Sequence, residues 1–141
     1  MIRRERSPFQ HAGMSLVEIL IALVVFIIAG GGLMVAHLYG SQLSEQAMAT
    51  MKAVNDLDDI MECIRATPFD TVTAAFPDGL PNGGGAGDYS AMVGGYTLVG
   101  EQITVRYPLQ TPERLEILVT VNWTQRGRAR STSLSTLKTK G

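Results

Sequence analysis

Glu18 is the residue whose type and position most directly suggest chemistry. It lies near the start of an apolar run, and no other residue from Glu18 to Ser44 carries a formal charge at neutral pH. An ionised side chain near the centre of a membrane helix costs roughly 2.5–3.5 kcal/mol, and less near a helix end. Glu18 is therefore either a functional residue or a residue at the membrane interface whose carboxylate reaches water.

The apolar run around Glu18 is long enough to form a membrane-spanning helix. A bilayer core about 30 Å thick requires about 20 apolar residues in helical form, and the stretch 14–38 meets that length. Arg3, Arg4 and Arg6 precede it, and positive charge before a span holds that end in the cytoplasm. The alternative is a secretory signal peptide cleaved near residues 29–31, but a charge inside the apolar region argues against that interpretation.

The residues from Gly13 to Glu18, with sequence GMSLVE, resemble the processing site of type IV prepilins and pseudopilins. That family has a basic leader, a glycine, a hydrophobic residue, Thr or Ser, two aliphatic residues and a glutamate. Gly13 matches the last leader residue, Met14 the first mature residue and Glu18 the fifth mature residue. Met14 replaces the commoner Phe and Ser15 the commoner Thr, and both variants fit the pattern. The resemblance covers roughly residues 1–50.

The resemblance implies a filament subunit. A prepilin peptidase would cut after Gly13, and the same enzyme would act as methyltransferase on the new amino group of Met14. Glu18 would neutralise the terminal amine of a neighbouring subunit, and such a pair offsets much of the cost of burying the carboxylate. The other implied partners are further pilins or pseudopilins in a helical filament and the inner membrane assembly platform. The implied location is the bacterial inner membrane, with the leader cytoplasmic and the C-terminal domain periplasmic, and then the pilus or pseudopilus.

Within this family the leading hypothesis is a minor pilin, similar to PilV-type subunits, that takes part in pilus initiation and assembly. Residues 61–68 and 119–123 look like that group. The main rival is a minor pseudopilin of a type II secretion system, which uses the same N-terminal signal. Cys63 is the only cysteine, so the chain cannot form the internal disulfide that many major pilins carry.

Composition argues against several other classes of function. No histidine follows His37 to act as a general base or metal ligand, and the glycine-rich stretch 82–87 lacks the Lys-Ser/Thr that follows a phosphate-binding loop. We therefore expect no enzyme activity, no catalytic residue, no cofactor, no metal site and no small-molecule substrate. Removing residues 1–13 takes away three Arg and one Glu, which changes the formal charge from −1 to −3 and makes general nucleic-acid binding unlikely by charge alone.

The pattern of apolar residues predicts an α+β protein with the pilin fold. One helix is expected from Met14 to Ala66, because from residue 41 onward apolar side chains recur at steps of three and four. The half of this helix after residue 40 should pack on a small sheet. The face predicted to be buried consists of Leu43, Ala47, Met51, Val54, Leu57, Met61 and Ile64.

The last third of the chain alternates apolar and polar residues, which predicts strands. The expected strands are 96–107, 115–124 and 130–137, with a turn around Pro108 and Pro112 and a hairpin turn at 125–128. Consecutive strands with short turns indicate an antiparallel meander. The apolar face of this sheet requires a cover, and the amphipathic half of the helix is the candidate.

Five regions are therefore predicted. They are a cleaved leader (1–13), a transmembrane or filament-core helix (14–39), an amphipathic helix (40–67), a Gly/Pro-rich loop (68–95) and an antiparallel sheet region (96–141). In the loop, Asp78, Asn82 and Asp88 offer oxygen atoms of the kind that bind calcium. Their spacing matches no known calcium loop, so we interpret them as solvated turn residues.

Basic residues gather at the end of the sequence, where no acidic residue follows Glu116. They could bind DNA phosphates or an acidic neighbour, which makes a filament-displayed DNA-binding or adhesin module the alternative of another class. The preferred interpretation is a solvated edge strand protected by charge. A membrane-anchored protein that never enters a filament is a third class. We call these residues the C-terminal basic cluster: Arg126, Arg128, Arg130, Lys138 and Lys140.

Overall fold

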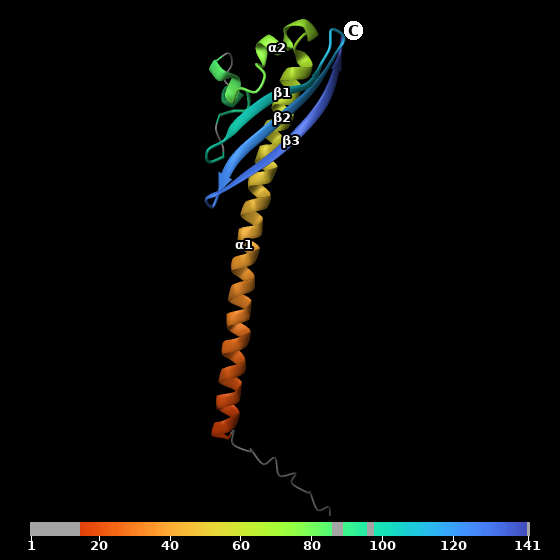
Figure 1. Ribbon diagram of the computed structural model, residues 1–141. Coiled ribbons are helices and arrows are strands. Elements are labelled where there is room, and N and C mark those ends of the chain that lie inside the picture. The colour runs from red at the N-terminus through yellow and green to blue at the C-terminus, as the bar shows by residue number, and fades with distance from the viewer. Residues whose placement is uncertain (1–14, 86–88, 96–97, 141) are drawn as a thin grey trace, which may run out of the picture. The chain divides into compact units, whose positions relative to one another are not determined.

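The computed structural model describes residues 15–85, 89–95 and 98–140. Residues 1–42 and 43–141 form two compact units. The principal elements are one long helix and a three-stranded antiparallel sheet, so the predicted α+β class is confirmed. In chain order they are α1 (Leu16–Ala66), β1 (Gln102–Gln110), β2 (Arg114–Gln125) and β3 (Arg128–Thr139), as Figure 1 shows.

Helix α1 begins and ends close to the predicted positions. It is continuous through the glycines at 30–32, although each glycine costs about 1 kcal/mol relative to alanine in a helix interior. At its C-terminal end, the amide and hydroxyl of Thr67 donate to the carbonyl oxygen of Cys63 at 3.1 and 2.8 Å. Pro68 follows, and the residue before a proline is disfavoured in helical conformation, so the helix ends here.

The sheet is an antiparallel meander in the order β1-β2-β3, as predicted. The predicted bounds of the first strand were wrong, because β1 begins only at Gln102 and continues through Pro108 to Gln110. Its pairing register with β2 shifts between Arg106 and Leu109. This irregularity accommodates Pro108, which has no amide to donate to a neighbouring strand.

The turn between β2 and β3 lies where the sequence predicted a hairpin. Arg126 and Gly127 both have positive φ angles, of 52° and 73°. Two central residues with positive φ characterise the two-residue turn whose twist matches that of antiparallel strands. From this turn the two strands pair without a register shift, ending with Arg114 opposite Thr139.

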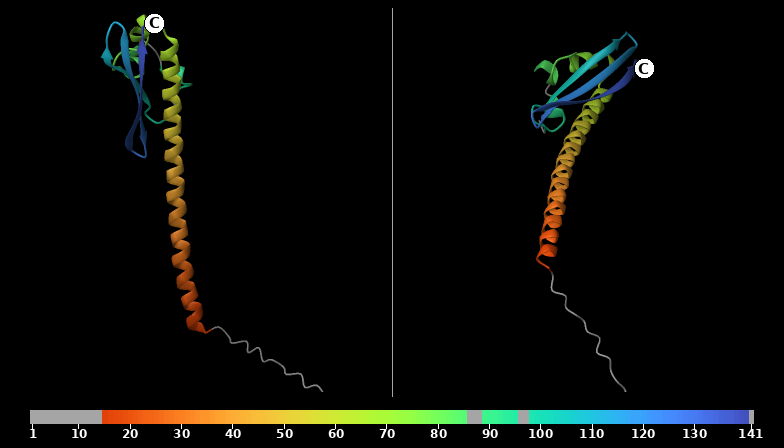
Figure 2. Two further views of the ribbon diagram at one scale, coloured as in Figure 1. Left: turned by 90° about the vertical axis from the view of Figure 1, so that its right-hand side faces the viewer. Right: turned by 60° about the horizontal axis from the view of Figure 1, so that its bottom comes forward.

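The core lies between one face of the sheet and the C-terminal part of α1, and the left view of Figure 2 shows the three strands alongside that part of the helix. Every second residue of β2 is buried, as the alternation predicted. The rings of Phe76 and Tyr89 stack beside them, with centroids 5.7 Å apart. The buried residues of β2 are Leu115, Ile117, Val119, Val121 and Trp123.

The predicted buried face of α1 was correct only in its C-terminal part, at Leu57, Met61 and Ile64. The upstream positions of that face are exposed, and Ala53, Asp56 and Ile60 are buried instead. At about 100° per residue, the upstream positions lie roughly a quarter turn away from the buried face. The exposed positions form what we call the upstream stripe: Leu43, Ala47, Met51 and Val54.

The region predicted as a Gly/Pro-rich loop contains short helical turns and is connected to β1 by hydrogen bonds. The hydroxyl of Tyr107 donates to the carbonyl oxygens of Phe76 at 2.7 Å and Val72 at 3.3 Å. Burial raises the pKa of Tyr107 well above its usual value, with smaller contributions from Tyr89 and Asp78. The helical turns are η1 (Phe69–Thr71), α2 (Val72–Ala75) and α3 (Tyr89–Met92). Between α2 and α3 lies the turn η2 (Asn82–Gly85), in which Gly83 and Gly84 have positive φ angles and the backbone is not helical.

Candidate functional site

The start of α1 carries a side-chain cap provided by Ser15. The amide of Glu18 donates to the Ser15 hydroxyl at 3.3 Å and to the Ser15 carbonyl oxygen at 3.0 Å. The amide of Ile19 donates to the same carbonyl oxygen at 3.2 Å. A serine directly before a helix typically accepts from the amide of the second or third helical residue, and Glu18 is the third.

Glu18 therefore has a local role that the sequence-based interpretation did not include. Ser15 followed three residues later by Glu18 is the sequence pattern of a capping box, and this signal was available before the structure. An acidic side chain in the first turn also interacts favourably with the positive end of the helix dipole, by about 0.3–1 kcal/mol. Glu18 thus favours the beginning of α1 at this point, whatever partner it has.

The helix residues on both sides of Glu18, and those that follow it as far as residue 41, expose a long apolar surface. All residues from 15 to 41 are exposed, including Leu16 and Phe26, each at 75%. Helix α1, which begins near the N-terminus of the chain, is long and apolar enough to cross a membrane. Contiguous apolar surface of this extent marks a contact with lipid or with other proteins.

Of the three residues predicted to act in processing and assembly, the structure describes Glu18. Gly13 and Met14 lie outside the described residues, so the cleavage and methylation site stays a prediction. The described geometry places Glu18 in the first turn of an exposed apolar helix, directly after the cap. At this position the carboxylate lies four residues from the predicted new amino terminus.

Three members of the C-terminal basic cluster bind groups within the chain. Arg126 Nη2 lies 2.6 Å from Glu45 Oε2, and Lys140 Nζ lies 2.7 Å from Asp70 Oδ1. Lys138 Nζ donates to the last carbonyl oxygens of α1, at 3.0 Å for residue 64 and 2.9 Å for residue 65. These contacts connect the two ends of β3 to the helical part of the same unit.

Arg128 and Arg130 are different, because neither forms a salt bridge within the described part of the chain. Both are exposed at the start of β3. Within the part of the chain that the structure describes, these are therefore the two cluster cations whose side chains form neither a salt bridge nor a hydrogen bond. This reduces the positive charge that the cluster can offer to phosphates, which weakens the basis for a DNA-binding module.

The polar residues of the 68–95 region stabilise the sheet. Asn82 Oδ1 accepts the amide of Ile103 at 2.9 Å, and Asp78 Oδ1 accepts the amide of Tyr107 at 3.2 Å. Asp88, the third oxygen donor considered for calcium, lies outside the described residues. Within residues 15–85, 89–95 and 98–140, no three His, Cys, Asp or Glu side chains are grouped to hold a metal ion.

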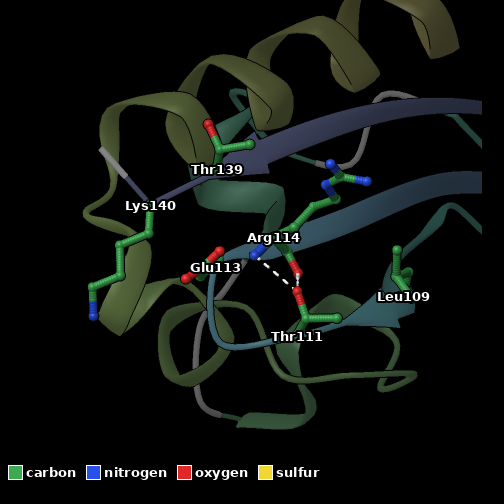
Figure 3. A pocket seen from close by; sticks show the side chains of 6 residues that line it. All are labelled: Leu109, Thr111, Glu113, Arg114, Thr139 and Lys140. Atoms are coloured by element: carbon green, nitrogen blue, oxygen red, sulfur yellow. Dashed lines mark hydrogen bonds between the residues drawn. The ribbon is translucent and has the colours of Figure 1, made fainter.

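A shallow depression lies at the turn between β1 and β2, shown in Figure 3. Its polar groups close the turn: Thr111 and Arg114 exchange backbone hydrogen bonds, and the Thr111 hydroxyl also bonds to the backbone of Arg114 at 3.0 Å. The amide of Lys140 donates to the carbonyl oxygen of Glu113 at 2.9 Å. In Figure 3 the side chains of Lys140 and Arg114 point in different directions, so they do not converge on a common ligand.

No protein-family model matches the chain, and neither does any curated protein or solved structure. At the first turn of α1 a cap, a carboxylate and an exposed apolar surface occur together, which makes this turn the candidate site.

Proposed function

We propose that the protein is a minor type IV pilin, a structural subunit that is processed by a prepilin peptidase and takes part in pilus initiation and assembly. The observation that carries this proposal is the place of Glu18 in the first turn of an apolar helix whose residues 16–41 are all exposed. The basic leader and the Gly13-Met14 pair before it supply the rest of the processing signal. A long helix followed by an antiparallel meander supports the pilin fold.

The exposed surface needs one cover before assembly and another cover afterwards. Lipid would surround residues 16–39 while the subunit is in the membrane, and helices of neighbouring subunits would replace it in the filament. A charged Glu18 favours the filament over the membrane when the methylated amine of a neighbouring Met14 pairs with it. Removing one partner of such a pair leaves an uncompensated charge, and this costs more than the net value of the pair.

The upstream stripe gives a second reason to expect contact with other subunits. Leu43 and Met51 are 69% and 64% exposed, although they lie on the helix within the same unit as the sheet. Burying an apolar side chain of this size contributes about 1.5–3 kcal/mol. Neighbouring helices in a filament would supply a cover that the chain itself does not.

A minor pseudopilin of a type II secretion system is the close rival, because it uses the same signal and the same type of assembly. The partners would be equivalent in both cases: a prepilin peptidase, other pilins or pseudopilins, and an inner-membrane assembly platform. The genes adjacent to this one distinguish the two systems, since pilus genes support the first assignment and secretion genes the second.

The N-terminal mass of the protein from its native membranes tests the proposal. We expect a chain that begins at Met14 and carries one added methyl group. Gly13→Val should leave the uncleaved precursor in the membrane, whereas the matched leader variant Ala12→Val should be cleaved normally. An intact Met1, or a start beyond residue 31, would contradict the proposal and indicate an anchored or secreted protein.

A further inference from the structure

The two edge strands of the sheet, β1 and β3, differ in how their outward backbone groups are covered. The outer edge of β1 is covered: the side chains of Asn82 and Asp78 accept the amides of Ile103 and Tyr107, at 2.9 and 3.2 Å. Pro108 and the register shift beside it interrupt the same strand. Proline, irregularity and a covering loop are the devices by which natural sheets prevent an edge from pairing with another chain.

The direction of the free backbone groups of β3 follows from the bonds of β2. The amide of Thr124 donates to the carbonyl oxygen of Val99 at 2.8 Å, on the β1 side of β2. The backbone amide and carbonyl groups of successive strand residues point to alternate sides of the strand. Val119 is an odd number of residues from Thr124, so its backbone groups point toward β3. Those of Leu134, which lies opposite Val119 on β3, point toward β2. The residues of β3 whose amide and carbonyl groups point away from the sheet are therefore Ser131, Ser133, Ser135 and Leu137.

These outward groups form an open edge. Within the described residues, no other backbone or side-chain group bonds to them, and all four residues are exposed. The run from Ser131 to Leu137 contains no charge and no proline, and its pairing with β2 is regular throughout. None of the three devices that protect β1 is present along this run of β3.

The charges at the two ends of the open edge indicate what can pair with it. From Arg126 to Lys140 the chain carries five basic residues and no acidic one. A second copy of β3, paired antiparallel over the uncharged run, would place Arg130 opposite Lys138. Like charges directly opposite are destabilising in a sheet, so another copy of this chain is a poor partner.

We propose that the open edge of β3 binds an extended segment of another protein as an additional antiparallel strand. Backbone hydrogen bonds would provide the affinity, as in other cases of strand addition. The segment would have an uncharged centre and acidic residues at its C-terminal end, which an antiparallel strand places beside Arg128 and Arg130. The proposal does not depend on whether the protein is a pilin.

The test uses the purified full chain in detergent micelles and a synthetic peptide. The peptide alternates valine and threonine and ends in Glu-Thr-Glu, so that both carboxylates lie on one face of the strand, as Arg128 and Arg130 do on β3, and the control peptide ends in Lys-Thr-Lys. Hydrogen–deuterium exchange should show new protection within residues 131–137 on adding the first peptide, with no change in β1. Binding of the fluorescently labelled peptides should favour the acidic one on the order of tenfold, because two favourable pairs replace two repulsive ones.

Two sets of variants test the edge and the charges separately. Ser133→Pro removes an outward amide without removing a bond to β2, and should weaken peptide binding on the order of tenfold, whereas Ser133→Ala should bind normally. Arg128→Glu combined with Arg130→Glu should reverse the preference toward the lysine peptide. These arginines form no salt bridge within the described residues, so this pair of changes leaves the fold intact.

Three results would overturn the proposal. Absence of protection in β3 at saturating peptide, or equal binding by the proline and alanine variants, would show that the edge is not the binding site. Protection of β3 that increases with protein concentration, without peptide, would identify a second copy of this chain as the partner. None of these results alters the N-terminal mass, so they are separate from the test of the pilin proposal.

Discussion

The hydroxyl of Tyr107, on β1, lies 2.7 Å from the carbonyl oxygen of Phe76, which directly follows helix α2 (Val72–Ala75). This single contact joins two segments that are 31 residues apart in the sequence. It also provides a donor for a backbone carbonyl group of a buried residue, and such groups are costly when left without one.

Tyr107→Phe should lower the free energy of unfolding by about 1–3 kcal/mol, because the change leaves the Phe76 carbonyl group without its donor. Tyr89→Phe is the matched control: the Tyr89 hydroxyl is also buried, but no described residue bonds to it, so its removal should be neutral or stabilising. Unfolding can be followed by the fluorescence of Trp123, the only tryptophan, which is 5% exposed. Equal losses for the two variants would contradict the assigned role of the Tyr107 bond.

Stability should fall at alkaline pH. Burial raises the pKa of Tyr89 from 10.0 to about 12 and raises that of Tyr107 in the same direction. Above the ordinary pKa the unfolded chain loses these protons while the folded chain keeps them, so deprotonation favours unfolding. We expect a constant contribution below pH 10 and a progressive loss between pH 10 and about 12. Tyr89→Phe should make this loss less steep, and an unchanged slope would contradict the assignment.

Glu18→Gln should separate the two roles of Glu18. Glutamine also occurs at this position of a capping box, so the helix should still begin at the same place, but the charge that would pair with a neighbouring amine is gone. We therefore expect normal cleavage after Gly13 and poor incorporation into filaments. The measurement compares N-terminal mass and the amount of protein in sheared filaments with those of the unmodified chain.

Ser15→Ala is the control for Glu18→Gln, because it removes the cap and keeps the charge. Loss of a serine cap costs about 0.5–2 kcal/mol of helix stability, so the first turn should fray. Incorporation should fall much less than in Glu18→Gln. If the serine variant were the more defective of the two, the helix cap rather than the ion pair would be the requirement for assembly.

Lys138→Met should destabilise the unit formed by residues 43–141. The Lys138 ammonium group bonds to two carbonyl oxygens in the last turn of α1, where positive charge is favourable. We expect a loss of about 1–2 kcal/mol, in the range of hydrogen bonds to charged groups. Arg128→Met is the control, and it should change the unfolding midpoint little because Arg128 forms no salt bridge within the described residues.

The elements of this fold could be predicted from local patterns, but the extent of the core could not. Alternation along 115–123 correctly identified the buried residues of β2, because both the period and the face are visible in the sequence. On α1 the period was also visible, but burial begins only at Ala53. Periodicity identifies an apolar side of a helix, yet how far a sheet covers it depends on contacts between distant segments.

The same distinction applies to the polar residues. The capping pattern of Ser15 and Glu18 is local and could have been found in the sequence. The partners of Lys138 and Asn82 lie 74 and 21 residues away and could not. For this reason the C-terminal basic cluster looked like one charged surface in the sequence, while three of its members bind within the chain.

The distance of 74 residues between Ile64 and Lys138 also has a kinetic consequence. Synthesis proceeds at about 5–20 residues per second, so roughly 4–15 s separate the emergence of these two residues. Until β1 emerges, beginning at Gln102, the apolar side of α1 that will face the sheet has no strand to cover it. Newly made chains therefore pass through an intermediate in which this apolar surface is exposed. A chaperone or a lipid surface has several seconds to bind it before the sheet packs on the helix.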